Sequence, residues 1–496
     1  DDACDWKSID KHTSGIIHQG NQYAVVRHII DDCTYYITIR WSGKASFTEK
    51  GKHQFTLVPE TNSINFSAEF TQTEPSAANL SEAKAQQAAS FAVISNKAKS
   101  YWKTFWTKGA AVDFSRCHDA RAKELERRVV LSQYLLAIQS AGSMPPQETG
   151  LTMNSWFGKF HLEMILWHEA WLPLWGHSEL LARTLKWYHQ AEPIARQIAE
   201  RQGFEGIRWM KMTDPSGMEA PSNVGSFLIW QQPHLIYLAE LVYRATGDIS
   251  FIKEYAKLVD ETAEFMYSFA NYDKKNKRYI LKGNIPAQES LKAATNVNSP
   301  FELSQWLTTM KMAQEWRERN GEKRNKKWDD LIEKLSVLAY NSDSLYLAAE
   351  SATDTYTNLK ATSDHPALLG ALGFFPESRL INKRIMNKTL DWIIANWNWP
   401  TSWGWDFPMT AMTATRLNQP EKAVDALLLN MQKNTYLNNG HNYQDQRLRL
   451  YLPGNGGLLS AVALMCAGWD GCEEKNPGFP KDGNWDVRWE GLQPMP

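Results

Sequence analysis

Residues 278–302, which read RYILKGNIPAQESLKAATNVNSPFE, separate two strongly helical regions and place a single carboxyl group, Glu289, in the polar loop between them. Upstream, apolar residues recur at helical spacing after a Gly247-Asp248 stop-and-cap pair, and a second helical pattern begins at Phe301. Loops held by a rigid scaffold often carry catalytic groups, although most loop glutamates are simply solvated. The pattern makes Glu289 a candidate functional residue in a mainly helical fold.

The helical pattern extends over almost all of the chain after residue 116. It predicts about twelve helices, each broken by Gly, Pro, Asn or Asp, near residues 116–142, 158–172, 177–203, 225–247, 249–270, 300–319, 323–341, 363–373, 376–396, 404–416, 418–433 and 456–468. Twelve helices paired as hairpins predict an (α/α)6 barrel, with long polar and aromatic loops on one rim. A plain helical bundle or a solenoid is the alternative, although no fixed-period repeat supports a solenoid.

The amino-terminal region has a different periodicity. Tyr35, Ile37, Ile39 and Trp41 alternate with polar residues, which predicts half-buried antiparallel strands between residues 12 and 70. We therefore expect a β-sandwich remainder, a helical linker, a catalytic barrel and a small β appendage, in residues 1–75, 76–115, 116–470 and 471–496. The strands are few for a self-sufficient sandwich, so we expect that further strands precede them in the complete protein.

Composition limits the classes of partner. The 54 basic and 55 acidic residues nearly cancel, and no apolar run is long enough to cross a bilayer. We therefore expect neither nucleic acid nor a membrane span, and the oligomeric state stays open. The five cysteines lack metal-ligand spacing, so no cofactor is expected, although a loop-bound calcium stays open. The start at DDACDW indicates a trimmed chain, secreted or periplasmic after removal of a signal peptide.

Tryptophan is unusually frequent, with 22 residues, many of them beside Pro, Gly or His. An indole offers a flat apolar face with a polar edge, which suits the C–H face of a pyranose as well as a protein core. The partner expected from this composition is an oligosaccharide or another glycan.

Three segments combine these aromatic residues with groups that could bind or react. The segment NSWFGKFHLEMILWHEAWLPLWG contributes His161, Glu163 and Trp167, and GIRWMKMTDPSGMEAPSN with the following WQQPH contributes Arg208, Trp209, Lys211, Trp230 and Gln231. The segment TSWGWDFPMTAM contributes Trp403, Trp405 and Asp406, and a lesser candidate, ATSDHPALLG, contributes Asp364 and His365. Ordinary explanations stand beside each of these: a buried helix start, a surface loop anchored by a tryptophan, and a helix cap.

The candidate chemistry follows from two separated carboxyl groups in a neutral, aromatic, helical site. Glu289 and Asp406 fit glycosidic bond cleavage, in which one carboxyl protonates the leaving oxygen and the other activates water. Motifs for lipase, zinc protease, nucleotide and nicotinamide chemistry are absent from the sequence.

The helical part also resembles glycoside hydrolase family 65, the kojibiose and maltose phosphorylases with their hydrolase relatives. ELLARTLKWYHQAEPIARQIAERQGFEGIRW resembles the family's second hairpin, and LVYRATGDISFIKEYAKLVDETAEF resembles the segment before its acid loop. RYILKGNIPAQES falls where the family carries Pro-Asp-Glu, so the resemblance implies that Glu289 is the general acid. MTAMTATRLNQPEKAVDALL and GNGGLLSAVALMCAG match the last two hairpins, and the fold implied is a β-sandwich, a linker and an (α/α)6 barrel.

Two departures from that family shape the expected function. TSWGWD stands where the phosphorylases carry a phosphate cradle, and Asp406 would repel phosphate, so hydrolysis is expected. KFHLEMILWHEAWLP instead resembles the α-L-fucosidases of family 95, where an Asn occupies the position of Glu163 and helps to position the catalytic water.

The resulting hypothesis is an inverting, exo-acting α-glycoside hydrolase, a glycosidase, with Glu289 as acid and Asp406 as base. The alternatives are an α-L-fucosidase or galactosidase, a polysaccharide lyase that uses His161 and Tyr443, and a non-catalytic carbohydrate-binding protein.

Overall fold

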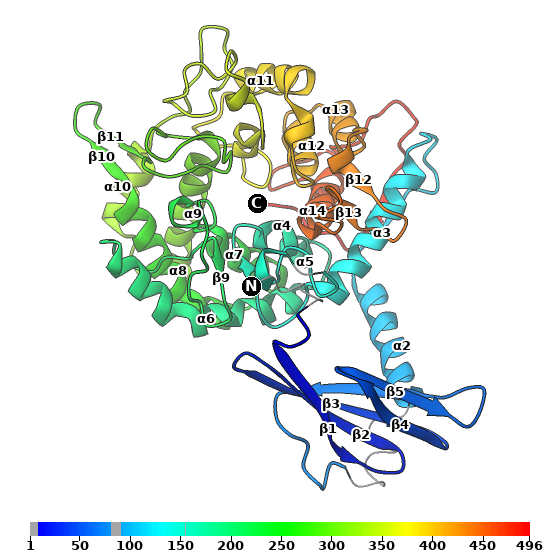
Figure 1. Cartoon of the computed structure of the whole chain (residues 1–496). Helices are drawn as coiled ribbons and strands as arrows, with labels where there is room; N and C mark the ends of the chain where they lie inside the picture. Colours follow the sequence, from blue (N-terminus) through cyan, green and yellow to red (C-terminus); the bar gives the residue numbers. More distant parts are fainter. Residues whose placement is uncertain (1–7, 81–90, 154) are drawn as a thin grey trace. The chain divides into compact units, whose positions relative to one another are not determined.

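The computed structural model describes residues 8–80, 91–153 and 155–496, and residue contacts divide the chain into one unit of residues 1–108 and another of residues 109–496 (Figure 1). The division falls within the range predicted as a linker. The first unit contains the antiparallel strands expected from the alternation in residues 12–70. The second unit is mainly helical.

The described strands of the first unit form a four-stranded sheet in the order β1-β2-β3-β6 and a two-stranded sheet of β4 and β5. Their bounds are His12–Gln19 for β1, Tyr23–Ile30 for β2, Cys33–Trp41 for β3, Ala45–Gly51 for β4, Gln54–Pro59 for β5 and Phe66–Thr71 for β6. Val26 and Trp41 from the larger sheet share a buried apolar core with Phe47 from the smaller one. The side-chain alternation that predicted the strands thus provides this core. Helix α2 (Phe91–Lys108) is the last element of the unit, and residues 81–90 of the predicted linker lie outside the described residues.

Two kinds of helix build the second unit. Helices of the first kind are buried on every side, as is typical of helices in the core of a large protein. Its members are α4 (Ile165–Glu169), α5 (Trp171–Leu174), α7 (His234–Thr246) over most of its length, α9 (Pro300–Arg319) over its first half, α12 (Asp406–Arg416) and α14 (Leu452–Ala467).

These buried helices contact one another in a closed sequence. Among the described residues, α4 and α5 contact α7, α7 contacts α9, and α9 contacts the short 3-10 helix η4 (Ala367–Ala371). Helix η4 in turn contacts α12, α12 contacts α14, and α14 returns to α4.

The second kind of helix is amphipathic and packs against the buried set. Its members are α3 (Ala122–Gln139), α6 (Ser178–Arg201), α8 (Ile249–Phe269), α10 (Lys326–Lys334), α11 (Lys383–Asn396) and α13 (Pro420–Leu427). In α8, for example, Phe251, Tyr255 and Leu258 are buried at helical spacing, and Asp248 caps the helix by accepting from the Ser250 amide at 2.8 Å. Figure 1 shows these helices following one another through the unit, from cyan α3 to orange α13.

Several α-helices are shorter than predicted: in the range 225–247 only His234–Thr246 is α-helix, and in the range 323–341 only Lys326–Lys334. Two further differences concern the candidate site. The range 363–373 contains only the 3-10 helix η4 and no α-helix, and Asp364 at its start adopts a left-handed φ of 68°, which interrupts a helix. The range 158–172 begins with the short strand β8 (Phe160–His161), and α-helix starts only at Ile165. Glu163 therefore lies just ahead of the helix, which is the arrangement that lets it point into a site.

Short strands join the loops of the second unit. They are β7 (Ala111–Asp113), β9 (Met212–Thr213), β10 (Asn271–Asp273), β11 (Arg278–Ile280), β12 (Thr435–Tyr436), β13 (Asn442–Tyr443) and β14 (Arg488–Glu490). The carboxyl-terminal segment returns to the unit through β14, which pairs with β7, and through the Gln493 amide, which donates to the Leu174 carbonyl at 2.9 Å. In the described part of the chain, no helix combines the length and the apolar character that a membrane span requires.

Candidate active site

Glu289 lies in the loop between β11 and α9, and its neighbours on both sides are anchored. The Ala287 amide donates to the buried carboxyl of Glu302 at 2.6 Å, and the Gln288 side chain donates to the Ala361 carbonyl at 2.8 Å. The Glu289 side chain itself is 31% exposed. The loop is therefore fixed while its carboxyl group remains accessible.

Lys211 joins Glu289 to Glu163. Its ammonium group lies 3.2 Å from Glu289 Oε1 and 3.3 Å from Glu163 Oε1. Backbone pairing brings the segments of Glu163 and Lys211 together: β8 pairs with β9, and the Leu162 amide donates to the Lys211 carbonyl at 2.8 Å. Burial alone would lower the pKa of Lys211, but the two carboxylates outweigh burial and raise this pKa above its ordinary value.

Two buried carboxyl groups flank this lysine. Burial raises the pKa of Glu163 to about 8, although the charge of Lys211 acts in the opposite direction. Burial likewise raises the pKa of Glu148 to about 7, and the Trp156 indole donates to Glu148 Oε2 at 2.6 Å. At neutral pH Glu148 and Glu163 can thus hold a proton, and they lie near Glu289, whose carboxyl group solvent reaches.

Asp406 forms the second part of the site at the first turn of α12. It is fully buried, accepts from His365 Nδ1 at 2.9 Å and accepts from the Trp403 amide at 2.7 Å. Asp364 Oδ1 lies 3.6 Å from the other ring nitrogen of His365. Burial would lower the pKa of His365, but Asp406 and Asp364 raise it to about 9, so the imidazole is a cation between two carboxylates.

Asp364 connects the two parts of the site. Burial raises its pKa, His365 lowers it, and the charge of Glu289 raises it further. The backbone amides of Ser290 and Glu289 also interact with the Asp364 carboxyl and lower its pKa. Glu289 and Asp406 are therefore linked through Asp364 and His365, two residues that the sequence offered only as lesser candidates.

Aromatic rings surround this acidic cluster. Trp405 stacks on His365 with ring centroids 4.2 Å apart, and the ring centroids of Trp403 and Tyr451 are 5.7 Å apart. Burial raises the pKa of Tyr451 well above its ordinary value, and the charges of Glu148, Asp406 and Glu163 raise it further. The Trp403 and Trp405 pair thus lies within the cluster, as the segment TSWGWD suggested.

Trp167 and Trp230 lie behind Trp405. Their ring centroids are 4.6 and 5.9 Å from that of Trp405, and both side chains are almost completely buried. Gln231 donates to the Trp209 and Leu228 carbonyls at 3.0 Å. These contacts give Trp167, Trp230 and Gln231 supporting positions rather than an open sugar-binding surface.

Arg208, Trp209 and His161 use their polar groups on partners within the fold. Arg208 donates to the Ser226 carbonyl at 2.6 Å, Trp209 Nε1 donates to the Thr262 hydroxyl at 3.1 Å, and His161 Nδ1 donates to the Lys159 carbonyl at 2.9 Å. The described contacts of Arg208 and Trp209 include none with the acidic cluster. Arg208 and Trp209, which the sequence offered as substrate-binding candidates, are both buried.

Two members of the cluster were missed in the sequence, Glu148 and Tyr451. Glu148 belongs to MPPQETGLTMNSW, one of the long polar loops predicted to line the functional rim, so its acidic residue could have been singled out. Tyr451 precedes the buried helix α14 and carries no comparable signal.

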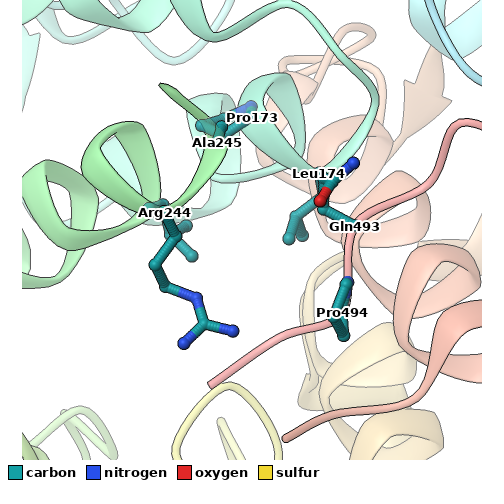
Figure 2. A pocket seen from close by; sticks show the side chains of 7 residues that line it. Pro173, Leu174, Arg244, Ala245, Gln493 and Pro494 are labelled. Atoms are coloured by element: carbon teal, nitrogen blue, oxygen red, sulfur yellow. The ribbon is translucent and has the colours of Figure 1, made fainter. Parts of the chain in front are cut away.

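Two further features lie apart from this cluster. The pocket shown in Figure 2 is lined by Pro173, Leu174, Leu241, Arg244, Ala245, Gln493 and Pro494 and includes none of the residues of the acidic cluster. Arg244 binds Asp470 there through two hydrogen bonds of 2.7 and 2.6 Å. Among the described residues, three potential metal ligands come close together only at His12, His28 and His53, in the first unit.

Comparison with known proteins gives two informative likenesses. No protein-family model matches the chain. The 1,2-alpha-glucosylglycerol phosphorylase of Bacillus selenitireducens is 26% identical over 153 residues, a match that covers 28% of this chain and 20% of that protein's length. The solved structure named "Putative kojibiose phosphorylase from human microbiome" is 12% identical, has a TM-score of 0.68 and covers 98% of this chain and 74% of that chain.

The structural likeness extends over nearly the whole chain, and the sequence likeness concerns part of it. The structural likeness shows a shared fold, in which a β-sheet region is followed by a mainly helical region. Together they support a resemblance to the family at the level of the fold and of part of the sequence. The chain is similar to glycoside hydrolase family 65 in fold and in part of its sequence.

Proposed function

We propose that the protein is an inverting, exo-acting α-glycoside hydrolase that cleaves an α-glucoside-type oligosaccharide. The observation that supports this proposal is the linkage of Glu289 to Asp406 through Asp364 and His365 in one aromatic-lined cluster. Two carboxyl groups with different environments are the equipment that glycosidic bond cleavage needs. The closed sequence of contacts among the buried helices supports an (α/α)6 barrel as the scaffold.

In this mechanism Glu289 protonates the glycosidic oxygen. Its partly exposed carboxyl can reach a substrate, and the anchored loop holds it in place. Lys211 orients Glu289 through the 3.2 Å contact, while Glu163 occupies the other side of the lysine.

Asp406 activates the attacking water. Burial raises the pKa of Asp406, which makes its carboxylate a stronger base, and His365 counteracts part of that rise and fixes its orientation. Trp403, which is only partly buried, provides an apolar face beside it for the sugar ring, and Trp405 stacks on His365.

Substitution of the two carboxyls tests these roles. We expect Glu289→Gln and Asp406→Asn each to lower kcat by about 10²–10⁴-fold, because each removes one proton transfer. Binding of an unreacted oligosaccharide, measured by calorimetry, should change little in Glu289→Gln.

Two further variants serve as comparisons. The turnover of Asp364→Asn is compared with that of Asp406→Asn, because Asp364 and Asp406 both contact His365. Glu490→Gln, on the exposed strand β14, is the surface control. Unchanged turnover in Glu289→Gln or Asp406→Asn would remove that residue from the mechanism.

Phosphorolysis is the second candidate, because both similar proteins carry the name phosphorylase. Against it stands the acidic character of the site, where Glu289, Asp364 and Asp406 would repel a phosphate ion. Proton NMR of the products, with and without phosphate, separates the two. Hydrolysis by inversion gives a free β-sugar in phosphate-free buffer, whereas phosphorolysis requires phosphate and gives a sugar 1-phosphate.

A further inference from the structure

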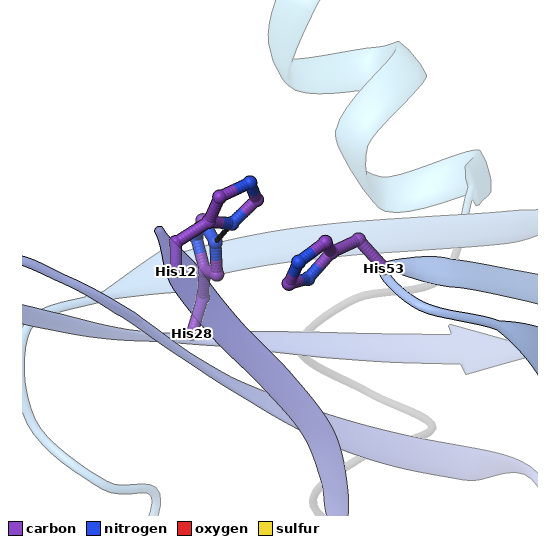
Figure 3. A group of neighbouring side chains, drawn as sticks. All are labelled: His12, His28 and His53. Carbon is purple, nitrogen blue, oxygen red and sulfur yellow. Dashed lines mark hydrogen bonds between the residues drawn. The ribbon is translucent and has the colours of Figure 1, made fainter. Parts of the chain in front are cut away.

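Three histidines meet at one end of the β-sandwich in the first unit. His12 belongs to β1, His28 to β2, and His53 lies in the turn between β4 and β5 (Figure 3). One potential ligand nitrogen from each ring lies within 4.8 Å of the others. Segments from both sheets therefore bring three imidazoles to one point.

Strand register places two of these rings on the core-facing side of the larger sheet. Ser14 pairs with His28 across β1 and β2, and His12 is two residues before Ser14, so the three side chains share one face. Val26, two residues before His28, lies on the same face and belongs to the buried core. The half-buried histidines thus extend the interior of the sandwich at its end, where solvent can still reach them.

Hydrogen bonds show which nitrogens can bind a ligand. His53 Nε2 lies 2.9 Å from the Ile9 carbonyl, which can only accept, so this nitrogen carries the proton. His53 Nδ1 then carries no proton, and its lone pair accepts from the Ser14 hydroxyl at 2.7 Å, a bond that a metal ion at this nitrogen would replace.

His28 is oriented in a comparable way. Its Nδ1 contacts the Tyr35 hydroxyl at 2.5 Å, and its Nε2 faces His12 Nδ1 at 2.6 Å. A second ring nitrogen held by a hydroxyl or carbonyl group is typical of histidines that bind metals, because it fixes the ring and the tautomer.

A cationic side chain next to one of the three rings is paired with a carboxylate. Lys52 is adjacent to His53, but its ammonium group is paired with Asp10 at 2.5 Å. The His12 and His53 rings are stacked with centroids 3.8 Å apart. Because the lone pairs lie in the ring planes, at least one of these rings must rotate before both can point at one ion.

We propose that His12, His28 and His53 bind a divalent transition-metal ion that favours imidazole, with Zn²⁺ as its representative, and that water occupies the fourth position. Zinc–nitrogen distances of about 2.0–2.1 Å require the nitrogens to lie about 3.4 Å apart, which rotations of the side chains can provide. The neutral imidazoles bind through their lone pairs, and the proton of His12 moves to its outer nitrogen. The ion would join β1 and β2 to the β4–β5 turn and stabilise the sandwich.

The test uses the full chain without an affinity tag, stripped of metal with EDTA and titrated with ZnSO4 or CoCl2. We expect one strongly bound ion per chain, visible absorption typical of tetrahedral Co²⁺, and a higher unfolding temperature of the sandwich with Zn²⁺. His28→Ala and His53→Asn should weaken binding by about tenfold or more. His53→Asn keeps the turn intact, because Asn tolerates the left-handed φ of 61° found there.

His18→Ala is the matched control, since His18 is also on β1 but is exposed and paired with Glu74. It should bind metal like the unsubstituted chain. Absence of saturable binding, or equal binding by the His53→Asn and His18→Ala variants, would overturn the proposal. Neither outcome depends on hydrolytic activity, so the metal site and the proposed function fail separately.

Discussion

A single lysine holds two carboxyl groups of different character at the candidate site. Glu289 is partly exposed, whereas only 2% of the Glu163 side chain is exposed, and both contact Lys211. One positive charge cannot fully compensate two carboxylates, and burial disfavours the ionised form of Glu163. The proton that Glu163 retains lowers the negative charge of the site, which favours the approach of a neutral sugar.

The protonation of Glu163 should make stability depend on pH. Because its pKa is about 8 in the folded protein and 4.5 is the ordinary value, the native state binds the extra proton between these pH values. The free energy of unfolding therefore falls as pH rises through this window. Glu163→Gln cannot lose a proton, so we expect a smaller fall in its melting temperature between pH 5 and pH 9, and greater stability than the unsubstituted chain above pH 8.

Glu490→Gln, which replaces an exposed glutamate, should keep the original pH dependence. Differential scanning calorimetry at pH 5, 7 and 9 makes the comparison. Parallel curves for Glu163→Gln and the unsubstituted chain would show that Glu163 is ionised throughout and that Lys211 compensates it fully.

The sequence identified several of these residues but not their contacts. Glu163, Lys211 and Asp406 stood out because charged groups interrupted apolar or aromatic segments, and Glu289 stood out because it lies in a loop between two helical regions. Arg208 and Trp209 gave the same signal, yet they bind the backbone and Thr262. Composition alone cannot distinguish a residue of the acidic cluster from one that is bonded within the core, because each is a polar group in an apolar segment. The contact that distinguishes them is made with a residue from a distant segment.

At the scale of elements, helix α14 packs very closely against α4. A Cβ atom added at Gly456 would lie 2.0 Å from the Trp167 carbonyl oxygen. Replacement of a helical glycine by alanine ordinarily stabilises a helix by about 1 kcal/mol. Here we expect Gly456→Ala to destabilise the protein by about 1–3 kcal/mol, because the two backbones must separate.

Urea denaturation followed by tryptophan fluorescence measures this change, with Gly142→Ala as the control. The nearest atoms to an added Cβ at Gly142 belong to the Met144 backbone, 3.9 Å away. That variant should lie within about 0.5 kcal/mol of the original. A Gly456→Ala variant as stable as the control would mean that α14 can move away from α4 at no cost.

Helical periodicity predicted most elements of the second unit because their apolar spacing reflects burial. Helices α8 and α9 match the predicted ranges 249–270 and 300–319 almost to the residue. The range 363–373 failed because its apolar residues are buried on every side in a 3-10 turn, where no periodicity identifies the type of helix. Its irregular backbone places His365 between Asp364 and Asp406, so this error lies at the candidate site itself.

At the scale of the whole second unit, Arg416 joins three segments that are distant in sequence. It ends α12, donates to the Gly373 carbonyl after η4 at 2.7 Å and donates to the Pro496 carbonyl at 2.8 Å. Its guanidinium also lies over the Trp469 ring, 5.1 Å from the centroid. Burial lowers the pKa of Arg416 to about 10, so it remains a cation at neutral pH and its hydrogen bonds stay charge-assisted.

Loss of this guanidinium should therefore weaken the unit as a whole. We expect Arg416→Met to lower the free energy of unfolding by about 3 kcal/mol, because two carbonyl groups lose a charged donor in a buried site. Arg488→Met provides the control: Arg488 pairs with Asp113 at 2.6 Å, but both side chains are nearly half exposed, so its loss should cost less than about 1 kcal/mol. Guanidinium chloride denaturation measures both variants. Equal losses would show that solvent or neighbouring groups replace the buried contacts of Arg416, and that the carboxyl-terminal segment is held by its apolar residues and by β14 alone.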